Sequence, residues 1–331
     1  MAQSITILGN GSWSTALVKL LTDNALHLNW WMRSTEALQH IEQTGRNPHY
    51  LSSIHFDLSL LTLYNDINKA IASADIILVG IPSAFVVEIF QQIPKELLQG
   101  KKIISAIKGI LPNRAILFNE YLEKEFDFLI SNYACISGPC HAEEVATDKL
   151  SYLTFASVDE AFSAQCASLF KGTHLHTVTS PDVYGVQYAA VLKNIYALGA
   201  GIAHGLDYGD NFLSVYITNC FAELQQFMDV ISTESLHHYN TSAYLGDLLV
   251  TCYSLHSRNR TFGNFIGKGY SVAATKLELN MVAEGYYASK GIHTICERIN
   301  YSLPIAHAIY EILWHQRSPV EAFKQIELLF S

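Results

Sequence analysis

The sequence predicts an α/β protein in which an N-terminal doubly wound parallel sheet is followed by a mostly α-helical domain. Three observations lead to this prediction. The 331 residues suffice for about two domains at roughly 150 residues each. The first half alternates short β-branched runs with helical patterns, which is typical of βαβ units. The second half shows long 3.6-residue periods and few strand-like runs, so we place a boundary near Pro181, between domains 1–181 and 182–331.

The expected strands are short, apolar and bounded by turn residues, as in strands buried on both faces of a parallel sheet. They are residues 4–8, 28–32, 76–81, 103–107 and 134–137. The segments between them that are long enough for helices are residues 14–24, 65–73, 83–92 and 113–125. One more unit is expected from strands 152–156 and 174–178, which flank a helical pattern at 159–170. Repeated right-handed units of this kind build a doubly wound sheet.

Composition and charge exclude several classes of protein. Half of the residues are apolar and 15% are charged, which fits large cores and excludes a disordered chain. The 21 basic and 30 acidic residues give a net charge of −9, which argues against nucleic acid as a partner. Polar residues interrupt the stretch 1–18, and it lacks a basic start, so we expect neither a signal peptide nor a membrane span.

The cysteines and histidines point to no metal. The six cysteines form no CxxC pair, so we expect buried thiols in a protein of the reducing cytoplasm. His237 and His238 are adjacent and would point in different directions from a helix. No HxxxH or HExxH pattern occurs, so we predict no metal site.

A glycine-rich turn follows the first expected strand and opens the first helix. It reads Gly9-Asn10-Gly11-Ser12-Trp13-Ser14. In a Rossmann-like sheet the first glycine permits a tight turn, the second lets the backbone approach a pyrophosphate, and the helix N-terminus offers N–H groups to the phosphates. A glycine-rich turn without a ligand would carry the same letters, but the strand before it and the helix after it favour a dinucleotide.

Arg33 follows the second expected strand, where NAD-specific enzymes usually place an acidic residue for the ribose 2′-hydroxyl. A guanidinium there could bind a 2′-phosphate and stack on adenine, so the sequence favours NADP over NAD. A solvated arginine at the end of a strand is the alternative.

Three basic positions form a candidate reaction centre. Lys108 follows the expected strand 103–107, at the sheet edge where ligands bind. Lys193 lies within an apolar stretch, where desolvation lowers the pKa of a lysine towards the range of proton transfer, and Asp247 is a candidate partner for it. Arg258, between Ser257 and Asn259, suits bidentate recognition of a phosphate. The alternatives are a surface lysine, a lysine that snorkels to solvent and a solvated basic loop.

Together these residues resemble the bacterial-type NAD(P)-dependent glycerol-3-phosphate dehydrogenases, over nearly the whole chain and in the family's order. The turn 9–14 looks like the family's GxGxWG loop, and Lys108-Gly109 matches its substrate-lysine motif. The segments similar to the family's GPSFAxE, catalytic-lysine, GDLxxTC, SRN and VVEG motifs are residues 138–143, 191–194, 246–252, 257–259 and 281–285.

The resemblance implies an oxidoreductase that reversibly reduces dihydroxyacetone phosphate to sn-glycerol 3-phosphate, feeding glycerophospholipid synthesis and lipid metabolism. Lys193 would donate the proton and Asp247 would orient it. The implied substrate-binding residues are Lys108, Gly138, Cys140, Lys193, Asp247, Ser257, Arg258 and Asn259. The implied residues for NADP or NAD are Gly9, Gly11, Ser12, Trp13, Arg33, Lys108, Ala142, Arg258, Val282 and Glu284. We expect a small phosphorylated substrate and a homodimer.

Four positions depart from the family's pattern: Ser14 replaces the third glycine, Cys140 and His141 replace Ser and Phe, and Asn219 replaces an arginine. These departures leave two alternatives open. One is a related two-domain dehydrogenase for another small keto or hydroxy acid, and the other is a non-catalytic nucleotide-binding sensor.

Overall fold

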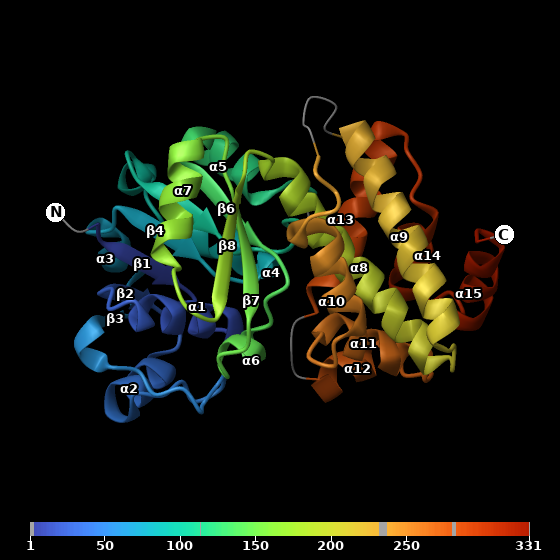
Figure 1. Cartoon of the computed structure of the whole chain (residues 1–331), viewed down its shortest axis with the longest axis horizontal. Coiled ribbons are helices and arrows are strands. Elements are labelled where there is room, and N and C mark those ends of the chain that lie inside the picture. Colours follow the sequence, from blue (N-terminus) through green and yellow to red (C-terminus); the bar gives the residue numbers. More distant parts are fainter. Residues whose placement is uncertain (1–2, 113, 232–236, 280–282, 331) are drawn as a thin grey trace. The chain divides into compact units, whose positions relative to one another are not determined.

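The computed structural model describes residues 3–112, 114–231, 237–279 and 283–330. The chain divides into two compact units. The sheet unit comprises residues 1–107 and 118–183, and the helical unit comprises residues 108–117 and 184–331. Figure 1 shows the sheet unit in blue to green and most of the helical unit in yellow to red.

The sheet unit contains one eight-stranded sheet with the order β3-β2-β1-β4-β5-β6-β7-β8. The strands are β1 (Ile5–Leu8), β2 (Leu28–Trp31), β3 (Leu61–Tyr64), β4 (Ile76–Val79), β5 (Lys102–Ser105), β6 (Tyr133–Ser137), β7 (Ser151–Ala156) and β8 (Leu175–Ser180). Neighbouring strands are parallel except β6 and β7, which are antiparallel. The chain proceeds outward from β1 to β3 and then outward from β4 to β6, which is the strand order of a doubly wound sheet, as the sequence predicts.

The helices of the sheet unit are α1 (Ser12–Asp23), α2 (Thr35–Thr44), α3 (Ile67–Ala72), α4 (Ser83–Phe90), α5 (Phe118–Phe126), α6 (Ala142–Val145) and α7 (Glu160–Leu169). Three of these helices, α2, α3 and α7, are capped at the N-terminus by a side chain. The side chains of Ser34, Asp66 and Asp159 accept hydrogen bonds from backbone N–H groups of the first turn. Every residue of β1 and of β4 is buried, so the core lies against these two central strands.

The structure adds elements that the sequence reading omits. Strand β3 and helix α2 were not among the expected elements, and the helix expected at 113–125 begins only at Phe118. Residues 108–112 and 114–117 instead belong to the helical unit, and Leu111 and Ile116 form an antiparallel bridge there. Asn113, the first residue of the expected helix, lies outside the described residues.

Helices dominate the helical unit. They are α8 (Val183–Gly205), α9 (Asp210–Ile231), α10 (Asp247–Tyr253), α11 (Arg258–Gly267), α12 (Val272–Leu279), α13 (Glu284–Ile299), α14 (Pro304–Trp314) and α15 (Pro319–Leu328). In the described parts of both units, no helix combines the length and apolar character that a bilayer crossing needs.

Glycines allow α8 and α11 to pack backbone to backbone. A Cβ at Gly201 would lie 2.0 Å from the carbonyl oxygen of Arg260, and one at Gly263 would lie 1.9 Å from that of Leu198. No side chain other than hydrogen fits such an approach. This packing fixes α11, which begins at Arg258, against the helix that carries Lys193.

Candidate active site

The glycine turn has the backbone geometry that an anion requires. Gly9 has a φ of +111°, which favours glycine, and Gly11 stands immediately before α1. The residue before α1 is Gly11, which has no side chain to cap the helix, and the first turn of α1 contains no acidic residue. A Cβ at Gly11 would meet nothing within 4 Å, so the space in front of this residue is open to a ligand. A helix start of this kind presents N–H groups and the positive end of its dipole.

The carbonyl groups of the same turn are each held by a hydrogen bond from the protein. Trp30 Nε1 donates to Gly9 O (2.7 Å), Asn47 Nδ2 to Asn10 O (3.0 Å) and Thr15 Oγ1 to Gly11 O (2.8 Å). A carbonyl oxygen facing a phosphate would repel it. Because these oxygens are engaged by protein donors, the turn fits a pyrophosphate, and so it fits the dinucleotide that its sequence predicts.

Asn47 supports the glycine turn, and the sequence did not predict this role. Its side chain is fully buried, also donates to Thr15 Oγ1 (2.8 Å), and accepts hydrogen bonds at Oδ1 from the N–H groups of His49 and Tyr50. Asn47 lies 37 residues from Asn10 in a polar loop. A loop asparagine before a proline predicts a turn, but nothing in that local pattern indicates so distant a partner.

Ser14 accounts for the departure from the third glycine. Its Oγ donates to the carbonyl oxygen of Gly80 at the end of β4 (2.8 Å). A Cβ at Gly80 would lie 2.3 Å from that Oγ. The close contact between helix and strand therefore requires a glycine at Gly80, on the strand side, instead of at position 14 on the helix. Close packing of α1 on the sheet is therefore preserved.

Arg33 is exposed after β2, and its guanidinium lies over the ring of Phe85, 5.7 Å from the ring centre. Asn65 Nδ2 donates to the carbonyl oxygens of Met32 (3.0 Å) and Arg33 (2.8 Å), which fixes the backbone at this strand end. Among the described residues no carboxylate forms an ion pair with Arg33, so its charge is available to an anion.

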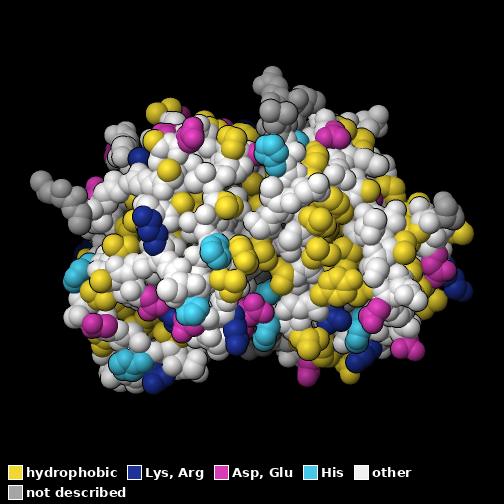
Figure 2. Space-filling view, viewed as in Figure 1, with side chains coloured by type: hydrophobic (Ala, Val, Ile, Leu, Met, Phe, Trp, Pro, Cys, Tyr) yellow, Lys and Arg dark blue, Asp and Glu magenta, His cyan; other side chains and the backbone are white. Residues whose placement is uncertain are grey.

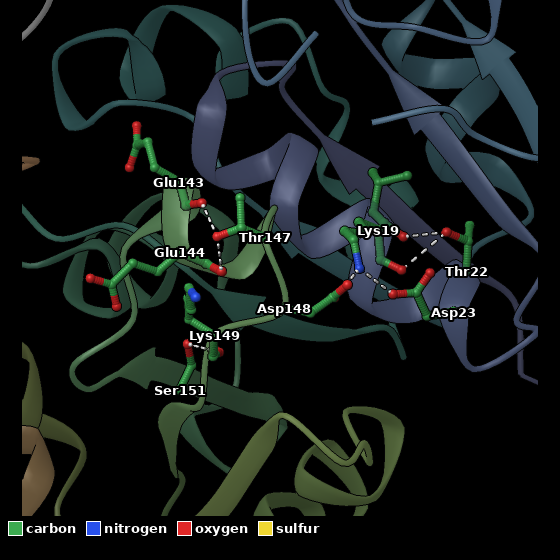
Figure 3. A network of polar contacts seen from close by, with 10 residues as sticks. Lys19, Thr22, Asp23, Glu143, Glu144, Thr147, Asp148, Lys149 and Ser151 are labelled. Carbon is green, nitrogen blue, oxygen red and sulfur yellow. Dashed lines mark hydrogen bonds and ion pairs between the residues drawn. The ribbon is translucent and has the colours of Figure 1, made fainter. Parts of the chain in front are cut away.

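The segment from Gly138 to Asp148 follows β6 and contains α6. Gly138 has a φ of +123°, and a Cβ there would lie 2.5 Å from the carbonyl oxygen of Tyr152 in β7. The close approach of the β7 backbone is therefore sufficient to require a glycine at this position. Figure 3 shows Lys19 of α1 between two carboxylates, with its Nζ 2.7 Å from both Asp23 and Asp148. Burial opposes the charge of Lys19, but hydrogen bonds and charge from both aspartates raise its pKa overall. This ion pair therefore holds the end of the segment against the helix that begins at the glycine turn.

Lys193 is the buried cation of the helical unit. It lies on α8, is 4% exposed, and forms an ion pair and a hydrogen bond from Nζ to Asp247 Oδ1 at the start of α10. Asp247 is 1% exposed. Burial lowers the pKa of Lys193 to about 8, and the positive charge of Lys108 acts in the same direction, while Asp247 opposes the shift. The amine can thus gain or lose a proton near neutral pH.

Two buried amides connect the other predicted residues of this unit. Asn194 Nδ2 donates to Lys108 O (3.0 Å), and Asn194 Oδ1 accepts from Asn259 Nδ2 (2.9 Å). Asn259 Oδ1 in turn accepts from the N–H of Gly285 (2.9 Å). These hydrogen bonds bring together the segment of Lys108, the start of α11 and the start of α13. Asn194 thus positions the backbone of Lys108 and the side chain of Asn259, a role that its neighbours in the sequence do not indicate.

Ser257 and Arg258 begin α11. The Oγ of Ser257 accepts a hydrogen bond from Arg260 N (3.3 Å) and caps the helix, and Ser257 is 3% exposed. Arg258 occupies the first helical position and is half-buried. A guanidinium at a capped helix N-terminus joins a full positive charge to the dipole of the helix, which is a favourable setting for a phosphate.

Comparison with known proteins gives the same result as these motifs. The family described as NAD-dependent glycerol-3-phosphate dehydrogenase matches with its N-terminus at residues 4–163 and with its C-terminus at residues 182–324. The glycerol-3-phosphate dehydrogenase (NAD(P)+) of Oceanobacillus iheyensis is 32% identical over 327 residues, which cover 98% of this chain and 93% of that one. The corresponding protein of Lacticaseibacillus paracasei is 34% identical over 331 residues, covering 97% and 93%. This chain belongs to the glycerol-3-phosphate dehydrogenase family.

Solved structures agree with this membership. Glycerol-3-phosphate dehydrogenase from Coxiella burnetii superposes with a TM-score of 0.92 at 27% identity, covering 98% of each chain. D-mandelate dehydrogenase reaches a TM-score of 0.61 at 13% identity and shares the fold alone. As a member of the glycerol-3-phosphate dehydrogenase family, the chain is an oxidoreductase that uses NAD or NADP.

The remaining family positions lie at helix starts, at a buried cysteine and on α9. Ser12 and Trp13 open α1, Ala142 opens α6, Cys140 is buried, and Glu284 is the first residue of α13. Val282 lies outside the described residues. Asn219, which replaces the family's arginine, donates from Nδ2 to Val215 O on its own helix (2.9 Å). The described residues contain no group of three side chains suited to a metal ion.

Proposed function

We propose that this chain catalyses the NAD(P)H-dependent, reversible reduction of dihydroxyacetone phosphate to sn-glycerol 3-phosphate. The observation that carries the proposal is the buried pair of Lys193 and Asp247, with the pKa of the lysine lowered to about 8. Reduction of a ketone produces an alkoxide that needs a proton, and a lysine with such a pKa can supply it near neutral pH.

When bound, the nicotinamide supplies a hydride to the carbonyl carbon. In the proposed step the Nζ of Lys193 donates its proton to the carbonyl oxygen as the C=O bond becomes an alcohol, and the amine becomes neutral. Asp247 accepts a hydrogen bond from Nζ, which fixes the direction of the amine and stabilises its charged form before transfer. In the reverse reaction the neutral amine takes the proton from the alcohol.

We further propose that residues 1–181 form the dinucleotide-binding domain, apart from residues 108–117, which belong to the helical unit, and that residues 182–331 form the helical substrate and catalytic domain. In the sheet unit the dinucleotide would contact Gly9, Gly11, Ser12, Trp13, Arg33 and Ala142, and the substrate would contact Gly138 and Cys140. In the helical unit the substrate would contact Lys108, Lys193, Asp247, Ser257, Arg258 and Asn259, and the dinucleotide would contact Lys108, Arg258, Val282 and Glu284. The open space at Gly11 and the half-buried Arg258 at a helix start support these assignments.

We also propose a preference for NADP, which rests on the guanidinium of Arg33, exposed after β2 and lying over the ring of Phe85. We also propose a homodimer. Figure 2 shows hydrophobic side chains gathered on the visible surface of the helical unit. Among the exposed apolar side chains of this unit are Val215 of α9, Leu249 and Tyr253 of α10, and Leu255 just after α10. We propose further that the enzyme is cytoplasmic and that its product serves glycerophospholipid synthesis. The six cysteines are buried and free, which is consistent with a reducing compartment.

The test is an initial-rate assay of the purified chain with a panel of carbonyl substrates. With dihydroxyacetone phosphate as substrate, the enzyme should oxidise NADPH, and also NADH, which is measured as a loss of nicotinamide absorbance. Unphosphorylated dihydroxyacetone and a small 2-keto acid should be turned over at least about tenfold less efficiently, because they lack the hydrogen bonds of a phosphate to Arg258. A preference for the keto acid, or dinucleotide binding without turnover on any substrate, would contradict the proposal. Sedimentation at micromolar concentration measures the dimer.

A further inference from the structure

The helical unit contains a cavity of about 610 Å³ that the proposed reaction does not use. It is lined by the turn after α11, the first half of α12, Tyr286 of α13 and the corner between α14 and α15. Sites for small molecules usually measure about 300–1,000 Å³, so the cavity has the size of a ligand site. Neither Lys193 nor any other residue to which we assign catalysis or binding lines it.

The charges at this cavity have one sign. Lys276 and Arg317 line it, and its lining contains no aspartate or glutamate, although acidic residues outnumber basic ones by 30 to 21 in the chain. Lys276 Nζ lies 3.7 Å from the centre of the Tyr286 ring, and desolvation lowers its pKa. Within the described part of the chain, neither cation forms an ion pair with a carboxylate. The cavity is therefore complementary to an anion.

One wall of the cavity is aromatic and held in place. The rings of Tyr286 and Trp314 stack with centres 4.3 Å apart and planes 26° from parallel. Trp314 Nε1 donates to Tyr286 O (3.3 Å) and to Ser289 Oγ (3.1 Å), which fixes the indole. Tyr270, also in the lining, makes an edge contact with Phe265 at 5.1 Å. Rigid aromatic surfaces beside a cation suit a ligand that is flat and apolar at one end and charged at the other.

We propose that this cavity is a second ligand site, which binds a small aromatic anion such as an aryl phosphate. The arene packs against the aromatic wall and the anionic group is held by Lys276 and Arg317. The proposal does not depend on the dehydrogenase reaction, because its residues and its measurement are separate from those of the active site.

The test is a titration of the full chain with 1-naphthyl phosphate. Binding is measured in two ways, by calorimetry and by the quenching of tryptophan fluorescence. Saturable binding is expected, with binding at least about tenfold weaker for 1-naphthol, which lacks the phosphate, and for inorganic phosphate, which lacks the arene. Trp314→Phe should retain binding by calorimetry and lose most of the quenching, because the other three tryptophans of the chain lie in the sheet unit.

Two charge variants locate the site. Lys276→Gln and Arg317→Gln should each weaken 1-naphthyl phosphate binding by about tenfold or more, while Lys324→Gln, at an exposed position outside the lining, should leave it unchanged. Dehydrogenase rates should stay the same in all three. Absence of saturable binding, or binding that both cavity variants leave intact, would overturn the proposal. Either result can be obtained whether or not the chain reduces dihydroxyacetone phosphate.

Discussion

The glycine turn of the sheet unit and the Lys193 centre of the helical unit are prepared for their ligands in opposite ways. The turn uses backbone atoms: its carbonyl oxygens are engaged by Trp30, Asn47 and Thr15, and the space at Gly11 is empty. The Lys193 centre uses charged side chains that are almost completely buried and paired. One site depends on shape and dipoles, and the other depends on a proton.

The two sites should therefore respond to different perturbations. A backbone site contains no group that titrates near neutral pH, but any added atom in front of it obstructs the ligand. A buried ion pair tolerates little change of charge, and the pKa of its lysine makes it sensitive to pH.

Replacing the proton donor should have the largest effect. Lys193→Ala should lower kcat by about 10²–10⁴, the usual contribution of a positioned acid–base group, while the affinity for dinucleotide changes little. Loss of the amine also removes the buried ion pair with Asp247, so the melting temperature should fall. Stopped-flow rates and a dinucleotide titration measure the two sites separately, with Lys324→Ala as an exposed control. Turnover within tenfold of the native rate would remove Lys193 from this role.

The pH profile should separate the two sites without any substitution. Reduction needs the protonated amine, so its kcat/KM should fall about tenfold per pH unit above a pH of about 8, reaching about a hundredfold two units higher. Oxidation needs the neutral amine and should rise with pH until about 8 and then level off. The Kd for NAD should stay flat over the same range, because the glycine turn binds through its backbone. A flat profile in both directions would contradict the assignment of Lys193.

The cofactor preference tests a charge within the otherwise backbone-based site. Arg33→Asp should lower kcat/KM with NADPH by about tenfold to a hundredfold, because a charged hydrogen-bond partner of the 2′-phosphate is lost, and should leave NADH use unchanged or improved. Lys69→Asp, an exposed change of the same charge in the same unit, controls for general electrostatics. Equal losses with both cofactors would show that Arg33 does not read the 2′-phosphate.

The sequence predicts the centre of each unit better than its edges. Strands β1 and β4 are completely buried, so their apolar runs were visible, whereas β3 is half-exposed at the sheet edge and gave no such run. Helix α2 was missed because only Ala37 and Ile41 are buried on it, which is too few for a clear period. β7 pairs antiparallel with β6, and an apolar run by itself does not indicate the direction in which a strand pairs.

The same limit applies to the sites. The glycine turn and the buried Lys193 are local patterns, and Asp247 pairs with the lysine as expected. The supporting amides were not predictable, because Asn47 reaches across 37 residues to Asn10, and Asn194 across 65 residues to Asn259. A polar residue in a sequence does not show which distant atom satisfies it.

Asn47 tests whether the support of the turn matters for binding. Asn47→Ala removes the donor to Asn10 O and frees that oxygen to turn towards a phosphate. The KM for the dinucleotide should rise by about tenfold, as expected for one lost hydrogen bond and a misdirected dipole. The KM for dihydroxyacetone phosphate and kcat should change little. Asn29→Ala, which removes side-chain contacts to Thr6 and Ser73 in the same unit, should leave all three constants unchanged. A uniform loss of activity would indicate general destabilisation instead.

Gly11→Ala should give the smallest but cleanest separation of binding from stability. The added methyl meets no atom of the protein, and the φ of −69° suits alanine, so the melting temperature should stay the same or rise slightly. The methyl would occupy the space in front of the turn, and dinucleotide affinity should fall by about fivefold to tenfold, towards the low end of the cost of overpacking. Gly172→Ala, at another position with open space, should change neither quantity. Gly80→Ala should do the reverse of Gly11→Ala and lower stability first, since its Cβ would collide with Ser14 Oγ. If Gly11→Ala bound dinucleotide normally, the pyrophosphate would have to lie elsewhere, and the backbone of this turn would not be the site.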